Sequence, residues 1–129
     1  MSNLLLVMAG GAIGSLCRFG LSSLMKRDTS SSFPLATLWI NLVGSFGMGL
    51  LVGIHANHFS QLLIGTGLIG GFTTFSTFEM ENLTLFQQRA YRKLILYVLS
   101  SGIGGVGLAM VGLQIGNLLI YLSASNSGL

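Results

Sequence analysis

The chain has 129 residues, of which 51% are hydrophobic and only 7% are charged, and its mean hydropathy is +0.78. Soluble domains carry about 25% charged residues, so this chain has too little charge to cover a surface that faces water. We therefore expect an all-α integral membrane protein with no room for a soluble domain. The net charge of +3 comes without a base-reading motif, which argues against a nucleic-acid partner.

Apolar runs predict four transmembrane helices in a single membrane domain, residues 1–129. Four GxxxG pairs, with glycines at 10/14, 49/53, 67/71 and 112/116, offer faces on which helices can pack closely, within one chain or between subunits. The last apolar run is longer than the ~20 residues needed to cross a bilayer, so its helix should tilt or project. The expected spans are 3–24, 34–54, 62–86 and 94–122.

One stretch inside the third span is poorly suited to a helix. It reads Gly70-Gly71-Phe72-Thr73-Thr74-Phe75-Ser76-Thr77-Phe78, and its glycines, threonines and phenylalanines favour other structures. A strand edge in lipid would leave N–H and C=O groups unpaired, at a cost of several kcal/mol for each group. We therefore predict a helix that breaks at mid-membrane and exposes its backbone to something other than lipid.

The broken span could serve ions of either sign. Hydroxyls and freed carbonyls come from Thr73, Thr74, Ser76 and Thr77. The carbonyls suit a small hard cation, whereas the N–H groups and hydroxyl protons suit a small anion. Phe75 and Phe78 could present electropositive ring edges to an anion, although a phenylalanine stripe more often serves packing. Asn41 lies in the middle of the second span, where it is either interhelical glue or a hydrogen-bond donor in a pore.

Other polar residues of the spans also allow a structural and a functional interpretation. Glu81 could lie at the mouth of a polar path, or pair with Arg89 or with a neighbouring subunit. Tyr97 and Ser101 could hydrogen-bond between helices. Arg18 is expected to reach the headgroups or to bond carbonyls at a helix end, with a role in an ion path as the alternative. No nucleophile–base pair accompanies these residues, so we expect no enzyme and no catalytic residue.

Three motifs stand in order along the chain. They are Gly10-Gly11-Ala12-Ile13-Gly14 with Arg18 behind it, Asn41-Leu42-Val43-Gly44 after Pro34-Leu35-Ala36-Thr37-Leu38, and the Gly70–Phe78 stretch. Together they resemble the fluoride channel family, Fluc, also called CrcB. The match in order and size covers essentially the whole chain, and the GG-x-TTFSTF element is highly specific.

The resemblance implies a dimer of four-span subunits, packed antiparallel with dual topology in a bacterial plasma (inner) membrane. Two pathways would let accumulated cytoplasmic fluoride leave passively. A structural sodium ion would be held at the centre by the backbone carbonyls of Gly70 and Thr73. The pore residues would be Asn41, Phe75, Phe78, Glu81 and Tyr97, and we place the hydroxyls of Ser76, Thr77 and Ser101 on the same path.

The distribution of charge departs from a dual-topology protein. The connections 25–32 and 87–93 are expected on the same side of the membrane, and they hold five of the six Lys and Arg residues. The positive-inside rule would then place both termini outside. We therefore hypothesise a heterodimer with an oppositely oriented paralogue, as the alternative to a homodimer.

Two other classes remain open from the residues themselves. A small proton-coupled multidrug exporter can also have four spans, but it needs a titratable carboxylate in its substrate cavity, and the first span has none. A non-transporting assembly subunit would be held by its GxxxG faces. Such a subunit would not require Asn41 or a hydroxyl-rich break.

Overall fold

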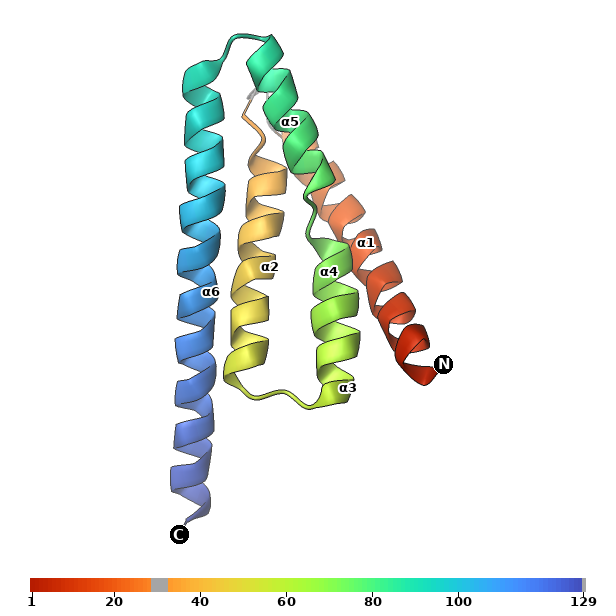
Figure 1. Cartoon of the computed structure of the whole chain (residues 1–129), viewed down its shortest axis with the longest axis vertical. Helices are drawn as coiled ribbons and strands as arrows, with labels where there is room; N and C mark the ends of the chain where they lie inside the picture. Colours follow the sequence, from red (N-terminus) through yellow and green to blue (C-terminus); the bar gives the residue numbers. More distant parts are fainter. Residues whose placement is uncertain (29–32, 129) are drawn as a thin grey trace.

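The computed structural model describes residues 1–28 and 33–128, and over these residues the chain is helical, without a strand. Part of the predicted 25–32 connection thus lies outside the described residues. The helices follow one another along the chain with short connections (Figure 1). They are α1 (Ser2–Asp28), α2 (Leu35–Gly53), α3 (His58–Ser60), the π-helix η1 (Gln61–Ile69), α4 (Gly70–Phe72), α5 (Ser76–Gln87) and α6 (Tyr91–Ser127).

Three of the described helices are long and apolar enough to cross a membrane. Their membrane-compatible segments are Ser2–Lys26, Leu35–Gly53 and Tyr91–Asn126. The predicted third span is instead divided, because the helix is interrupted at residues 73–75 between α4 and α5. The helix break predicted from the sequence is therefore confirmed.

Helix ends extend beyond the predicted spans at both ends of the chain. α1 continues to Asp28 and α6 to Ser127, whereas hydropathy placed the ends of these spans at residues 24 and 122. The added residues are polar, so hydropathy excluded them, but nothing in them stops a helix. The first glycine of this tail is Gly128, and it follows the last residue of α6.

The four GxxxG pairs join the helices two by two within the chain. A Cβ atom at Gly14 of α1 would lie 2.1 Å from the Leu68 carbonyl oxygen of η1. A Cβ atom at Gly49 of α2 would lie 2.0 Å from the Ala109 carbonyl oxygen of α6. Backbones can approach this closely only where side chains are missing. The pairs at 10/14 and 67/71 thus join α1 to η1 and α4, and the pairs at 49/53 and 112/116 join α2 to α6.

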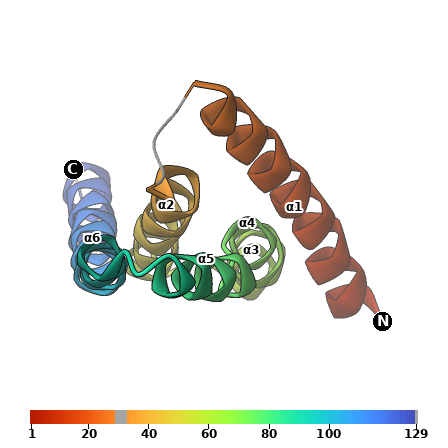
Figure 2. The ribbon, with the colours of Figure 1, turned by 90° about the horizontal axis from the view of Figure 1, so that it is seen from above.

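The break is the place where the chain passes from one helix pair to the other. α4 lies beside α1, and after the break α5 runs across toward α6 (Figure 2). η1, which leads into α4 and the break, is a nine-residue π-helix. Such segments are rare and often lie next to functional sites.

The cation-bearing connections meet at one end of the molecule. The end of α1, the start of α2 and the α5–α6 turn lie together there, while the α2–α3 connection and both termini lie toward the other end (Figure 1). The α5–α6 turn closes tightly, because Arg89 takes a φ of 55° and the Ala90 N–H donates to the Leu85 carbonyl. This arrangement agrees with the predicted side for the connections 25–32 and 87–93, as far as the described residues extend.

Candidate functional site at the helix break

The backbone leaves the helix at Thr73, which is extended. Thr73 has φ −75° and ψ 158°, and by Phe75 the chain has returned to helical angles, with φ −90° and ψ −38°. Threonine suits this conformation because its β-branched side chain favours extended backbone. The Thr73 N–H and the Thr73 hydroxyl both donate to the Ile69 carbonyl, each at 2.9 Å, and so close the last turn before the break.

Asn41 of α2 pairs with the exposed backbone of the break. Its Nδ2 donates to the Thr74 carbonyl at 3.0 Å, and its Oδ1 accepts from the Thr74 N–H at 2.9 Å. The side-chain amide pairs with this backbone as a neighbouring strand would. The pairing removes the free-energy cost of leaving an N–H and a C=O group unpaired away from water. Of the two interpretations of Asn41, the structural one is thus directly observed.

Several carbonyls lose their usual helical donors at the break, and those of Gly70 and Thr73 are among them. In a regular helix the N–H of residue i+4 donates to the carbonyl of residue i. The Thr74 N–H, which would serve Gly70, donates to Asn41, and the Thr77 N–H, which would serve Thr73, donates to the Thr74 hydroxyl at 3.3 Å. Gly70 and Thr73 are the two residues predicted to bind a cation through their carbonyls. The hydrogen-bond pattern therefore suits that donor set.

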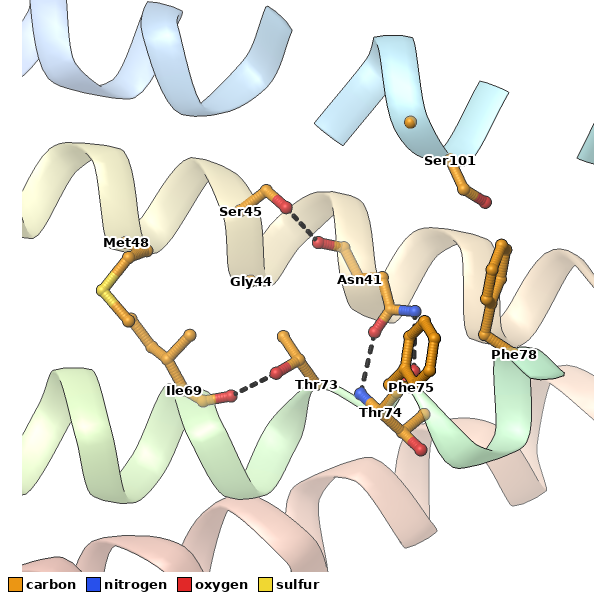
Figure 3. A pocket seen from close by; sticks show the side chains of 11 residues that line it. Asn41, Gly44, Ser45, Met48, Ile69, Thr73, Thr74, Phe75, Phe78 and Ser101 are labelled. Atoms are coloured by element: carbon orange, nitrogen blue, oxygen red, sulfur yellow. Dashed lines mark hydrogen bonds between the residues drawn. The ribbon is translucent and has the colours of Figure 1, made fainter. Parts of the chain in front are cut away.

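A cavity of about 440 Å³ opens on the α2 and α6 side of the break, and we call it the Asn41 cavity. Figure 3 shows Asn41, Phe75 and Phe78 around it, with Ser101 directed into it from α6. The Ser101 hydroxyl is buried and has no hydrogen-bond partner among the described residues. A buried hydroxyl without a partner is uncommon in native proteins and calls for an explanation. The structure thus brings together four of the predicted pore residues.

Aromatic rings continue from the Asn41 cavity toward the α5–α6 end of the molecule. The ring centroids of Phe75 and Phe78 are 6.0 Å apart, and those of Phe78 and Tyr97 are 5.1 Å apart. Phe33 completes the row, with its ring edge-on to Tyr97 at 5.7 Å. Tyr97 is fully buried by these contacts, whereas Phe75 is 72% exposed.

Glu81 lies at the far end of this aromatic row. Its Oε2 accepts from the Tyr97 hydroxyl at 2.7 Å, and its Oε1 accepts from the Thr37 hydroxyl at 2.9 Å. Within the described part of the chain Glu81 does not pair with Arg89, which was one of the expectations. The reason is geometric, because the buried hydroxyls of α2 and α6 reach the carboxylate, whereas Arg89 lies in the turn beyond α5.

A second cavity, of about 300 Å³, lies on the α1 side of the break, and we call it the Arg18 cavity. Arg18 and Lys26 of α1 both line it, and neither forms a hydrogen bond or ion pair with the described side chains, which do not include those of residues 27 and 28. Arg18 therefore lines a cavity, and its expected contact with headgroups or with carbonyls at a helix end stays a prediction. Thr74 lines both cavities, and Thr77 lines the second. Hydroxyls of Ser15, Ser22, Ser23 and Thr37 complete the polar lining.

Comparison with known proteins fits this geometry. A family described as "CrcB-like protein, Camphor Resistance (CrcB)" matches residues 5–113. The chain belongs to the CrcB family. CrcB relatives include a "Fluoride-specific ion channel FluC 2" of Bacillus cereus (strain ATCC 10987 / NRS 248), 42% identical over 118 residues, which are 92% of this chain and 100% of that protein.

Two further CrcB relatives carry the name "Fluoride-specific ion channel FluC 1". The one from Carboxydothermus hydrogenoformans is 41% identical over 91% of this chain and 95% of its own length. The one from Listeria monocytogenes serotype 4b is 41% identical over 88% of this chain and 97% of its own length. The family resemblance found from the motifs is confirmed, and with its apolar helices this CrcB protein is a multi-pass membrane protein.

Thr74 was expected only as one of several hydroxyls and carbonyls at the break, and Thr37 was not singled out. Thr74 donates and accepts at the centre of the break, and its hydroxyl also contacts Ser76 at 3.3 Å and Thr77 at 3.1 Å. Thr37 bonds Glu81. The signal for Thr74 was its place beside Thr73 in the hydroxyl-rich stretch of an apolar span. Thr37 gave no comparable signal, because one threonine near the start of a helix is common.

Proposed function

We propose that this protein is a fluoride-selective channel that gives cytoplasmic fluoride a passive route out of the cell. The observation that carries the proposal is the Asn41 cavity beside the break, with a buried and unpartnered hydroxyl directed into it. Its membership of the CrcB family, whose curated relatives are named fluoride-specific ion channels, supplies the identity of the anion.

The Asn41 cavity suits a small anion better than a cation or an apolar solute. The Ser101 hydroxyl needs an acceptor, and a dehydrated halide is a strong one. Ring edges of Phe75 and Phe78 carry the positive part of the quadrupole and add attraction without competing protons. No acidic side chain lines this cavity within the described residues, so nothing there repels an anion.

The Arg18 cavity gives the anion a way to reach the break. Its two cations have no protein partner among the described residues, so they can raise the local anion concentration. Thr74 and Thr77 stand at its inner end, and Thr74 separates it from the Asn41 cavity. In the proposed path, fluoride passes the hydroxyls of Thr74, Ser76 and Thr77 and continues along the aromatic row toward Tyr97 and Glu81.

A sodium ion is proposed at the carbonyls of Gly70 and Thr73. Both carbonyls lack their regular helical donors, so their lone pairs are available to a small hard cation. A bound cation there would offset negative charge in the path. Thr73→Ala should change sodium binding little, because the proposed ligand is a carbonyl, and the increase in melting temperature on exchanging N-methylglucamine for sodium measures this.

Assembly into a dimer is part of the proposal. Phe75 lines the Asn41 cavity yet is 72% exposed in the single chain, so a second subunit is needed to close that side. The cationic end of the chain favours one orientation, and curated relatives carry the paired names FluC 1 and FluC 2. We therefore favour a heterodimer with an oppositely oriented paralogue over a homodimer.

Efflux from proteoliposomes tests the function. Purified protein is reconstituted in vesicles that contain potassium fluoride and sodium, and an ion electrode records fluoride release into a potassium-free medium after valinomycin lets potassium leave with it. We expect rapid release of fluoride and no matching release from vesicles loaded with chloride. Equal chloride release, or no fluoride release from the chain alone and with its paralogue, would contradict the proposal. Transport that required a proton gradient would indicate an exporter.

A further inference from the structure

We propose that Gly44 is a positioning residue for the break, because its missing side chain lets Thr73 approach α2 closely enough for Asn41 to pair with the Thr74 backbone. Gly44 lies one turn beyond Asn41 on α2, and both line the Asn41 cavity (Figure 3). A Cβ atom at Gly44 would lie 2.1 Å from Thr73 Cγ2, which no pair of carbon atoms tolerates.

Only one methyl group stands in the way of a side chain at Gly44. The next nearest atoms to the added Cβ would be Thr73 Cβ at 3.6 Å and Ile69 Cγ2 at 3.7 Å, both at ordinary contact distance. The obstruction is therefore specific to the Thr73 methyl group. No backbone atom stands within 4 Å among the nearest neighbours, in contrast to Gly14 or Gly49, where the added atom would meet carbonyl oxygens.

Rotation of the Thr73 side chain cannot relieve this clash without a loss. The three substituents on Thr73 Cβ occupy staggered positions in a fixed order. The only rotamer that turns the hydrogen toward Gly44 also moves the hydroxyl away from the Ile69 carbonyl, which it now bonds at 2.9 Å. A side chain at Gly44 therefore either breaks that bond or moves the Thr73 backbone away from α2.

Movement of Thr73 would reach the ion site directly. Thr74 follows it in the chain, and its N–H and carbonyl are held by Asn41 at 2.9 and 3.0 Å. A small displacement of Thr73 and Thr74 breaks both hydrogen bonds to Asn41 and leaves the Thr74 N–H free for another acceptor. The freed carbonyls and the lining of the Asn41 cavity then change together. The contact between Gly44 and Thr73 thus controls the geometry of the break.

The test is a set of substitutions with a designed rescue. Gly44→Ala should lower initial fluoride efflux about ten-fold, as overpacking a fixed contact does. Thr73→Ser keeps the hydroxyl and removes the methyl group, and its own efflux is the reference for the double variant. The double variant Gly44→Ala/Thr73→Ser should recover most of the lost efflux, because the new methyl group then meets only atoms at 3.6 Å or more.

Gly47→Ala is the matched control. Gly47 lies one turn further along the same helix, and an added Cβ would meet only Ile69 Cδ1, at 3.4 Å. Both alanine variants gain the same helix propensity, so a difference between them reports the Thr73 contact. Gly44→Ala with the efflux of Gly47→Ala would overturn the proposal, and so would a double variant no better than Gly44→Ala.

A second readout separates this proposal from the proposed function on which the efflux assay rests. The melting temperatures of the same four variants should show the same pattern, with a loss in Gly44→Ala and recovery in the double variant. If the wild type released no fluoride, the proposed function would fail while the melting temperatures still tested the contact. If Gly44→Ala could not be purified, recovery of folded protein in the double variant would decide. A double variant that melts at as low a temperature as Gly44→Ala would overturn the proposal.

Discussion

Asn41 holds the path of the backbone at the break through both atoms of one amide group. Its Nδ2 and Oδ1 satisfy the carbonyl and the N–H of Thr74. The same side chain lines the Asn41 cavity, so its packing role and its place beside the proposed path do not exclude each other. An amide fully engaged with backbone can offer an ion only what remains of its hydrogen-bonding capacity, such as the second Nδ2 proton.

Asn41→Ala should destabilise the protein and slow fluoride efflux. Two backbone groups of Thr74 lose their partner, and each unpaired buried group costs about 1–3 kcal/mol. The melting temperature in detergent and the efflux rate measure the two effects. Asn126→Ala is the control, since Asn126 is exposed near the end of α6. A melting temperature equal to that of the control would refute the role of the amide in holding the break.

Ser101→Ala should separate function from stability. The Ser101 hydroxyl is buried without a partner, so its removal should leave the melting temperature unchanged or raised. Loss of a hydrogen bond to a charged acceptor should still slow fluoride efflux about ten-fold. Ser100→Ala serves as the neighbouring control, because the Ser100 hydroxyl is exposed and bonds the Leu96 carbonyl. Efflux equal in the two variants would remove Ser101 from the path.

The close pairing of helices determines where the break lies. α1 holds η1 and α4 through glycines, and α2 holds α6 in the same way. The break lies between these two pairs, so its residues can be reached from α2 on one side and from α1 on the other. Two cavities therefore meet at Thr74.

Gly14→Ala tests this pairing. The added Cβ would lie 2.1 Å from the Leu68 carbonyl oxygen and 2.8 Å from the Phe72 backbone nitrogen, so the helices must separate. We expect a loss of about 1–3 kcal/mol, visible as a lower melting temperature. At Gly20 of the same helix nothing lies within 4 Å of an added Cβ, so Gly20→Ala should leave stability unchanged or raise it slightly. The same melting temperature for both variants would argue against close packing at Gly14.

The sequence was informative about elements and less so about contacts. Hydropathy and the Gly70–Phe78 composition predicted an all-helical chain and the break, because lipid leaves few options for such residues. The GxxxG spacing located the packing faces but left open which helices they join. The π-helix η1 carried no recognisable signal. The bonds of Thr37 and Thr74 depend on which helices meet in space, and one sequence does not contain that information.

The whole molecule has one cationic end. The end of α1 and the α5–α6 turn lie at the end away from the termini (Figure 1). Lys26 belongs to the last turns of α1, and Arg89, Arg92 and Lys93 belong to the α5–α6 turn and the start of α6. Lipid bilayers with anionic inner leaflets and the insertion machinery both favour such an end on the cytoplasmic side. A single orientation would leave an antiparallel dimer dependent on a second protein.

Expression of the chain alone should give a single orientation with both termini outside. A reporter at the C-terminus, active on only one side of the membrane, measures this. Replacing Arg89, Arg92 and Lys93 by glutamine should shift the population toward a mixture, because the bias comes from these charges. Equal amounts of the two orientations in the unmodified chain would contradict the heterodimer proposal and favour a homodimer.

The most direct test of the account is fluoride efflux through Phe78→Ile, measured beside the wild type in vesicles loaded with fluoride or chloride. Phe78 joins the Asn41 cavity to Tyr97, whereas Phe86, which contacts Tyr91 outside both cavities, provides the control Phe86→Ile. We expect fluoride release without chloride release in the wild type and in Phe86→Ile, and about ten-fold slower fluoride release in Phe78→Ile with its assembly intact. Unselective release, or equal fluoride release in all three proteins, would contradict this expectation.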